Sequence, residues 1–246
     1  LILSLYTGLL GYVGAKTGLS LDLLSQRAFG EKGSYLPSAM TSFTQIGWFS
    51  VGSFVSGGTA TPNFARFAKN GKSGAITTVV AFFIGNSLMF FFGAVSSIFV
   101  GGNDIFEVMV RLNLFYLAVL VLGLNIWTTN DNALYTAGLG LANIFHQRKK
   151  PMVLLSGIIG TVASVWLYYN FCGWLNILNC TLPPVGMILV LAYFMNKEDF
   201  EADQPKLKTV DWFAVAGVIL GAIVANLLHW GIASINGMVV AAVCYC

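Results

Sequence analysis

The chain has 246 residues, of which 57% are hydrophobic and only 9% carry a charge. A water-soluble domain needs a more polar surface than this, so the composition excludes a soluble protein and indicates an integral membrane protein in the lipid bilayer. The formal net charge of +3 comes from short basic loops, which are typical of the cytoplasmic face of membrane proteins, and we expect no nucleic-acid partner.

Apolar segments follow one another along the whole chain. They are about 20 residues long, which suits membrane-crossing helices rather than the ~10-residue strands of a barrel. We therefore expect an all-α integral membrane protein, with residues 1–246 forming a single transmembrane domain. The expected segments are 1–15, 36–52, 53–68, 73–100, 114–143, 152–170, 174–195, 212–229 and 232–246.

Lysine and arginine gather in a few loops between these segments. Under the positive-inside rule these loops lie in the cytoplasm, which predicts a multi-pass protein of the bacterial cytoplasmic (inner) membrane. The basic loops are 16–32, 66–72, 148–150 and 197–208.

The stretch from Pro37 to Asn63 has no charge and no loop-sized polar turn, although both of its flanks are basic. A chain that leaves the cytoplasm and returns to it needs a reversal between its two crossings. Either Gly52 begins a tight re-entrant hairpin, or residues of a longer transporter are absent between about Val51 and Ser53. We favour the second interpretation and expect a gap in the sequence near 52/53.

A polar island interrupts the apolar segment 114–143. Four of its residues lie at i, i+3, i+4 and i+7 and share one helix face. Neutral oxygens in such a row suit a hard cation, and they equally suit hydrogen bonds between helices, so both interpretations stay open. The row consists of Asn125, Thr128, Thr129 and Asn132.

Asp131 is the one acidic residue that we place inside a membrane segment. A carboxylate there must be paired, protonated or beside water. A proton relay is possible in principle, but no lysine, arginine or histidine is spaced to continue it. We therefore favour a structural hydrogen-bond acceptor.

Gln45 and Trp48 lie one helical turn apart on segment 36–52 and share a face with Phe49. A carboxamide can meet a donor–acceptor edge with two hydrogen bonds, and an indole can stack on a flat ring, so this pair suits a flat heterocycle. The alternative is that Trp48 serves in packing or as an interfacial anchor.

The stretch from Gly52 to Pro62 contains paired glycines and ends in proline, which argues against an unbroken helix. Broken helices at membrane depth are where secondary transporters bind substrate and ion. Ser53, Phe54 and Ser56 stand at this break, and close packing through small residues is the alternative.

Sequence motifs of enzymes are absent from the chain. It has no Ser/His/Asp set, no HExxH, no nucleotide-binding GxxxxGK[ST] and no CxxC, so hydrolysis, ATP-driven pumping and redox chemistry have no support. We expect a transporter, not an enzyme.

Several strings together resemble the nucleobase:cation symporter-1 family. The resemblance implies a LeuT-type fold, with five-plus-five inverted-repeat helices followed by two more. It also implies that the first, fourth and fifth helices are absent, the last two at the 52/53 junction. The strings are GYVGAKTG (11–18), QIGWF (45–49), GNSLMF (85–90), LGLNIWTTNDNALY (122–135) and GIIGT (157–161).

The same resemblance implies a sodium-coupled importer of cytosine that works by alternating access. We infer no obligate protein partner. The nucleobase is expected between Trp48 and Phe54, with polar contacts from Gln45, Ser53, Ser56 and Asn125. Sodium is expected on the hydroxyls of Thr128 and Thr129 and the carbonyl of Asn125. Another flat heterocycle (uracil, a purine, allantoin or a hydantoin) and, from a different class, a channel remain as alternatives.

Overall fold

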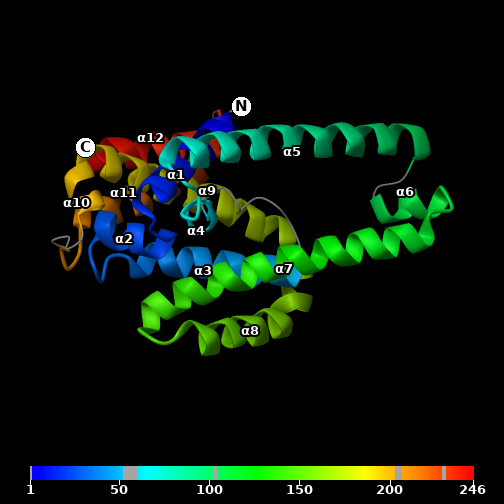
Figure 1. Ribbon diagram of the computed structural model, residues 1–246, viewed down its shortest axis with the longest axis horizontal. Coiled ribbons are helices and arrows are strands. Elements are labelled where there is room, and N and C mark those ends of the chain that lie inside the picture. Colours follow the sequence, from blue (N-terminus) through cyan, green and yellow to red (C-terminus); the bar gives the residue numbers. More distant parts are fainter. Residues whose placement is uncertain (1, 52–59, 102–104, 203–206, 229–230) are drawn as a thin grey trace.

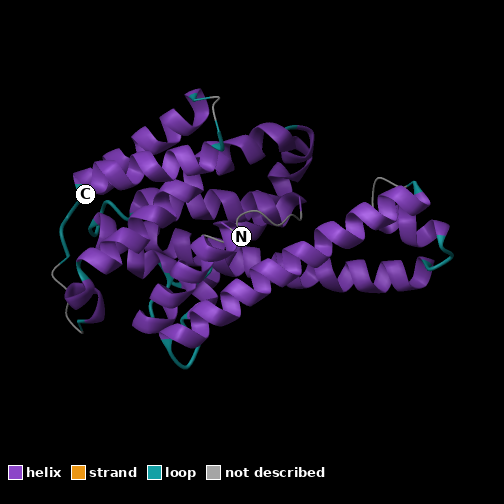
Figure 2. Cartoon of the chain, turned by 90° about the horizontal axis from the view of Figure 1, so that it is seen from above, coloured by secondary structure: helices purple, strands orange, loops and turns teal. Residues whose placement is uncertain are grey.

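The computed structural model describes residues 2–51, 60–101, 105–202, 207–228 and 231–246. Every regular element in these ranges is a helix, as Figure 2 shows, which confirms the all-α prediction. The helices are α1 (Ile2–Thr17), α2 (Leu21–Phe29), α3 (Tyr35–Val51), α4 (Pro62–Ala65), α5 (Gly71–Val100), α6 (Ile105–Arg111), α7 (Phe115–Phe145), α8 (Lys149–Tyr169), α9 (Phe171–Met195), α10 (Lys197–Glu201), α11 (Trp212–Leu227) and α12 (Ala233–Tyr245).

The long helices follow the apolar segments expected from the sequence, apart from segment 53–68. In the described part of that segment the helix covers only Pro62–Ala65 and is followed by turns. Proline suits the first turn of a helix, so Pro62 starts α4 here. Within residues 60–68, the described part of the segment, the chain is therefore helical only in α4. Three described helices are long and apolar enough to cross a membrane, namely Gly71–Val100, Lys149–Leu167 and Phe171–Met195.

The helices pack in groups. α1 lies along α5 and contacts α4, α3 packs on both α7 and α8, and α9 packs on α11 and α12. Figure 1 shows α2, the α7–α8 turn and α10 towards one end of the molecule, with α6 at the opposite end. The basic segments that contain α2, the α7–α8 turn and α10 thus lie towards one end, which we call the basic end.

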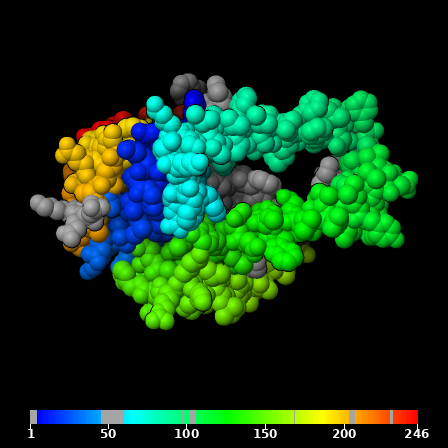
Figure 3. Space-filling view, in the orientation of Figure 1, coloured from blue at the N-terminus to red at the C-terminus, as the bar shows by residue number. Residues whose placement is uncertain are grey.

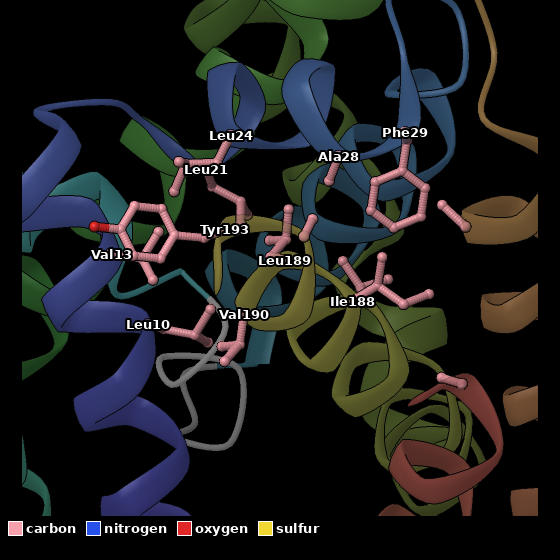
Figure 4. Close-up of a cluster of buried hydrophobic side chains, with 14 of the residues drawn as sticks. Leu10, Val13, Leu21, Leu24, Ala28, Phe29, Ile188, Leu189, Val190 and Tyr193 are labelled. Carbon is pink, nitrogen blue, oxygen red and sulfur yellow. The ribbon is translucent and has the colours of Figure 1, made fainter. Parts of the chain in front are cut away.

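The main hydrophobic core lies where α1, α2 and α9 meet. Leu10 of α1, Leu24 of α2 and Leu189 of α9 are each fully buried, and Figure 4 shows their side chains pointing toward one another. The short helix α2 is held in place at its start, where Ser20 caps it and the Asn63 side chain accepts a 2.8 Å hydrogen bond from its first backbone N–H.

α5 and α7 project beyond the body of the molecule and are joined at their far end by α6 (Figures 1 and 3). Their outer halves expose large apolar side chains, such as Phe99 at 82% and Tyr116 at 87%. Apolar surfaces of this size suit a lipid environment, in keeping with a multi-pass membrane protein.

α3 and α7 approach closely at Gly140. A Cβ atom added there would lie 2.8 Å from the Ser38 carbonyl oxygen and closer still to Ser42 Oγ. Ser42 Oγ donates a 3.1 Å hydrogen bond to the Ala137 carbonyl. Small residues are the usual means by which membrane helices pack this closely.

We expect Gly140→Ala to destabilise the protein by roughly 1–3 kcal/mol, because α3 and α7 must move apart to admit the methyl group. The measurement is the thermal unfolding midpoint in detergent. Gly123→Ala on the same helix is the matched control, since nothing lies within 4 Å of its added Cβ. Equal midpoints for the two variants would contradict close packing at Gly140.

Candidate functional site

A cavity of about 490 Å³ lies between the group formed by α1, α4 and α5 and the group formed by α3 and α7. Alanine and phenylalanine form much of its apolar wall, and threonine, asparagine and glutamine side chains add polar groups to it. A concave, largely apolar site with a few polar groups is typical of a small-molecule binding site.

α7 contributes a row of polar residues to the cavity wall. Thr129, Asn132 and Thr136 lie at i, i+3 and i+7 and all line the cavity. Part of the predicted oxygen row therefore faces this space. Asn125 and Thr128 do not line it, their side chains are exposed, and Thr128 Oγ1 donates to the carbonyls of Leu124 and Asn125 at 3.1 Å each.

The structure brings Gln45 of α3 to the same cavity, which Thr129 and Asn132 of α7 also line. Trp48 lies one turn further along α3, but its side chain is outside what the structure describes. Ser53, Phe54 and Ser56 also lie outside the described residues. The geometry thus unites three of the polar residues singled out from the sequence.

Asp131 does not face the cavity. Its side chain is exposed on α7, and within the described ranges it has neither a hydrogen bond nor an ion pair. The structure therefore offers no donor there for the acceptor role that we favoured from the sequence.

Several cavity residues were not singled out from the sequence. Thr77, Thr78 and Asn86 of α5 and Thr61 before α4 line the cavity together with Thr136. Thr136 could have been found, because it continues the α7 row by one more turn. The α5 residues could not, because one threonine or asparagine in an apolar helix is common.

Tyr135 joins three elements at the side of the cavity nearest the basic end. Its hydroxyl accepts a hydrogen bond from Nη2 of Arg66, the residue directly after α4. Its ring lies 6.2 Å from the Phe64 ring of α4, and Lys149 Nζ of α8 lies 3.4 Å from its ring centroid. This cluster links the two helix groups between which the cavity lies.

A buried polar network lies beyond this cluster and ties α2 to α3 and α7. Asp22 of α2 is 5% exposed and accepts a 2.6 Å hydrogen bond from Ser38 Oγ of α3. The Asn143 amide of α7 donates to Ser38 Oγ at 2.9 Å, and its carbonyl oxygen accepts from Gln26 Nε2 at 2.5 Å. Side chains from three elements therefore share one set of hydrogen bonds.

Burial raises the pKa of Asp22 to about 6, although the hydrogen bond from Ser38 and the positive charge of Arg66 act in the opposite direction. Asp22 lies on the short helix α2 within a basic loop, outside the membrane-spanning segments. Its carboxyl group is therefore partly protonated in mildly acidic solution.

The chain matches a family model described as a permease for cytosine/purines, uracil, thiamine and allantoin, over residues 1–60 and 50–245. Cytosine permeases of Escherichia coli K12, O6:H1 and O157:H7 are each 36% identical to it over 338 residues, an alignment that covers 100% of this chain and 80% of each relative. These findings confirm the resemblance seen in the sequence, and they indicate a transporter rather than an enzyme. Together with its apolar helices, they place the chain in the family of permeases for cytosine/purines, uracil, thiamine and allantoin.

Proposed function

We propose that the protein is a sodium-coupled symporter that imports cytosine across the cytoplasmic membrane by alternating access. The observation that carries this proposal is the cavity between two helix groups, into which α3 directs Gln45 and α7 directs Thr129 and Asn132. The relatives named cytosine permease support cytosine as the substrate.

We further propose a LeuT-type arrangement for the complete transporter. The alignment with the relatives spans 338 positions although this chain has 246 residues, and the family match falls into two pieces that meet at residues 50–60. Both observations support a gap near 52/53, where the fourth and fifth helices of that fold would belong.

Cytosine in this proposal lies between the rings of Trp48 and Phe54. Gln45, Ser53, Ser56 and Asn125 provide its polar contacts. Support comes from Gln45, which lines the cavity and precedes Trp48 by one helical turn in α3. A carboxamide beside an aromatic ring suits a flat base with neighbouring donor and acceptor atoms.

Sodium is the co-transported ion, and Thr128, Thr129 and the Asn125 carbonyl are the proposed ligands. Thr128 Oγ1 donates its proton to helix carbonyls, so its lone pairs stay available to a cation. These oxygens fit a hard cation, and further oxygens must complete the shell.

Uptake of labelled cytosine by cells or vesicles with the complete transporter tests the proposal, with sodium exchanged for choline. We expect saturable uptake that depends on sodium. Uptake that does not depend on sodium would contradict the proposed coupling. Uptake that does not saturate with cytosine concentration would favour a channel. Competition by uracil, purines or allantoin, which the family description names, ranks the alternative substrates.

Thr129→Ala is expected to raise the sodium concentration needed for half-maximal uptake by about tenfold, which corresponds to the loss of roughly 1.4 kcal/mol of ion binding. Maximal uptake at saturating sodium should change little. Thr161→Ala on α8 is the matched control, because Thr161 donates within its own helix and does not line the cavity. An unaltered sodium dependence of Thr129→Ala would refute its role as a ligand.

A further inference from the structure

The cavity extends along α7 from Thr129 toward the basic end. Thr136 lies two turns beyond Thr129 along α7, about 10 Å by the rise of an α-helix. Two further residues line the cavity near this end. They are Phe64 of α4 and Gly74 in the first turn of α5. The cavity volume of about 490 Å³ lies in the range of roughly 300–1,000 Å³ that suits drug-sized ligands, which exceeds the need of one single-ring base.

Thr136 is the most unusual polar group in this part of the cavity. It is 2% exposed, and none of the described residues offers its hydroxyl a hydrogen-bond partner. Thr78, across the same cavity, shows the ordinary arrangement, since its hydroxyl donates to the Gly74 carbonyl of its own helix at 2.7 Å. A buried hydroxyl without a partner is unfavourable unless a ligand or water satisfies it.

The surroundings of Thr136 suit a flat, polar-edged ring. Asn132 lies one turn before Thr136 on α7, so a carboxamide and a hydroxyl stand side by side on the wall. The Phe64 ring supplies an apolar face, and Ala65 and Ala133 leave room beside it. A heterocycle stacked on Phe64 can present its donor and acceptor atoms to Asn132 and Thr136.

We propose that Thr136, Asn132 and Phe64 form a second binding station for the flat heterocycle that the protein transports, which the substrate occupies after it leaves the site at Trp48. This proposal rests on the proposed transport function. The station lies directly inside the cluster of Tyr135, Arg66 and Lys149. A substrate held there therefore occupies the last position before release toward the basic end.

Thiol modification in inside-out vesicles tests the station in the complete transporter. Thr136→Cys is treated with a charged methanethiosulfonate reagent, with and without cytosine. The parent transporter, which includes the four cysteines of this chain, gives the background. We expect the introduced thiol to react, and cytosine at about ten times its Kd to slow the reaction about tenfold by occupying the station. Ser73→Cys is the matched control, because Ser73 is exposed near the same end and does not line the cavity.

The decisive comparison repeats the measurement with Trp48→Ala added. Protection of Thr136→Cys that persists in this background, with no protection of Ser73→Cys, supports a separate station. Protection that disappears with Trp48, equal protection at Ser73, or an unreactive thiol at position 136 each overturns it. Normal cytosine uptake by the parent together with any of these outcomes rejects the station alone, whereas absent uptake rejects the proposed function as well.

Discussion

Trp48→Ala is expected to weaken cytosine binding by about one to two orders of magnitude, because stacking of an aromatic ring on a base contributes roughly 1–3 kcal/mol. Trp48 lies on α3, one turn beyond the cavity residue Gln45. Trp48→Phe keeps an aromatic face and should lose less affinity than Trp48→Ala. Equilibrium binding of labelled cytosine to purified transporter measures these differences.

Trp127→Ala is the matched control for this prediction. Trp127 lies on α7 beside the polar row, but its side chain is 67% exposed and does not line the cavity. We expect Trp127→Ala to leave cytosine affinity unchanged. If Trp48→Ala also bound cytosine as the parent does, the stacking role would have to be abandoned.

Asp22→Asn is expected to stabilise the folded protein at pH 7 by up to about 3 kcal/mol, as judged from the rise in the pKa of Asp22. That pKa rises from 3.8 to about 6, chiefly because burial disfavours the charged carboxylate. Asparagine keeps an oxygen that can accept the hydrogen bond from Ser38 and carries no charge to desolvate. Thermal unfolding in detergent at pH 7 compares the variant with the parent.

The raised pKa of Asp22 also predicts how the stability of the folded protein depends on pH. The folded state holds the Asp22 proton more tightly than the unfolded state, so the contribution of Asp22 to stability falls as pH rises from about 3.8 to about 6. The parent should therefore gain stability relative to Asp22→Asn when pH is lowered from 7 to 4.5. Asp199→Asn on α10 replaces an exposed carboxylate and is the control. A difference between parent and Asp22→Asn that does not change with pH would contradict a buried, titrating carboxylate.

Hydropathy predicts most of the long helices, because a membrane-crossing helix needs a long apolar run and little else. It does not predict α2, α6 or α10, which are short and lie between those runs. Their positions depend on contacts with distant residues, such as the hydrogen bond from the backbone of Leu21 to Asn63. Such contacts leave no local pattern in the sequence.

The candidate site could be predicted in part. Helical spacing correctly places Thr129 and Asn132 on one face, but it does not say which way that face points. The direction depends on how α7 packs on α3 at Gly140 and Ser42, and this packing turns Thr136 toward the cavity while leaving Asn125 and Thr128 outside it. The roles of Trp48, Ser53, Phe54 and Ser56 stay predictions.

The arrangement around Tyr135 has a consequence for the energetics of opening. Any movement that separates α4 from α7 at this end must break the hydrogen bond from Arg66 to the Tyr135 hydroxyl. Water entering the gap can hydrate the released guanidinium and phenol, so most of the lost interaction is recovered and the net cost is only about 1.5–3 kcal/mol. In the alternating access that we propose, a closure of this kind holds this end shut in nearly all resting copies, yet it yields to the modest free energy that a bound solute or ion can supply.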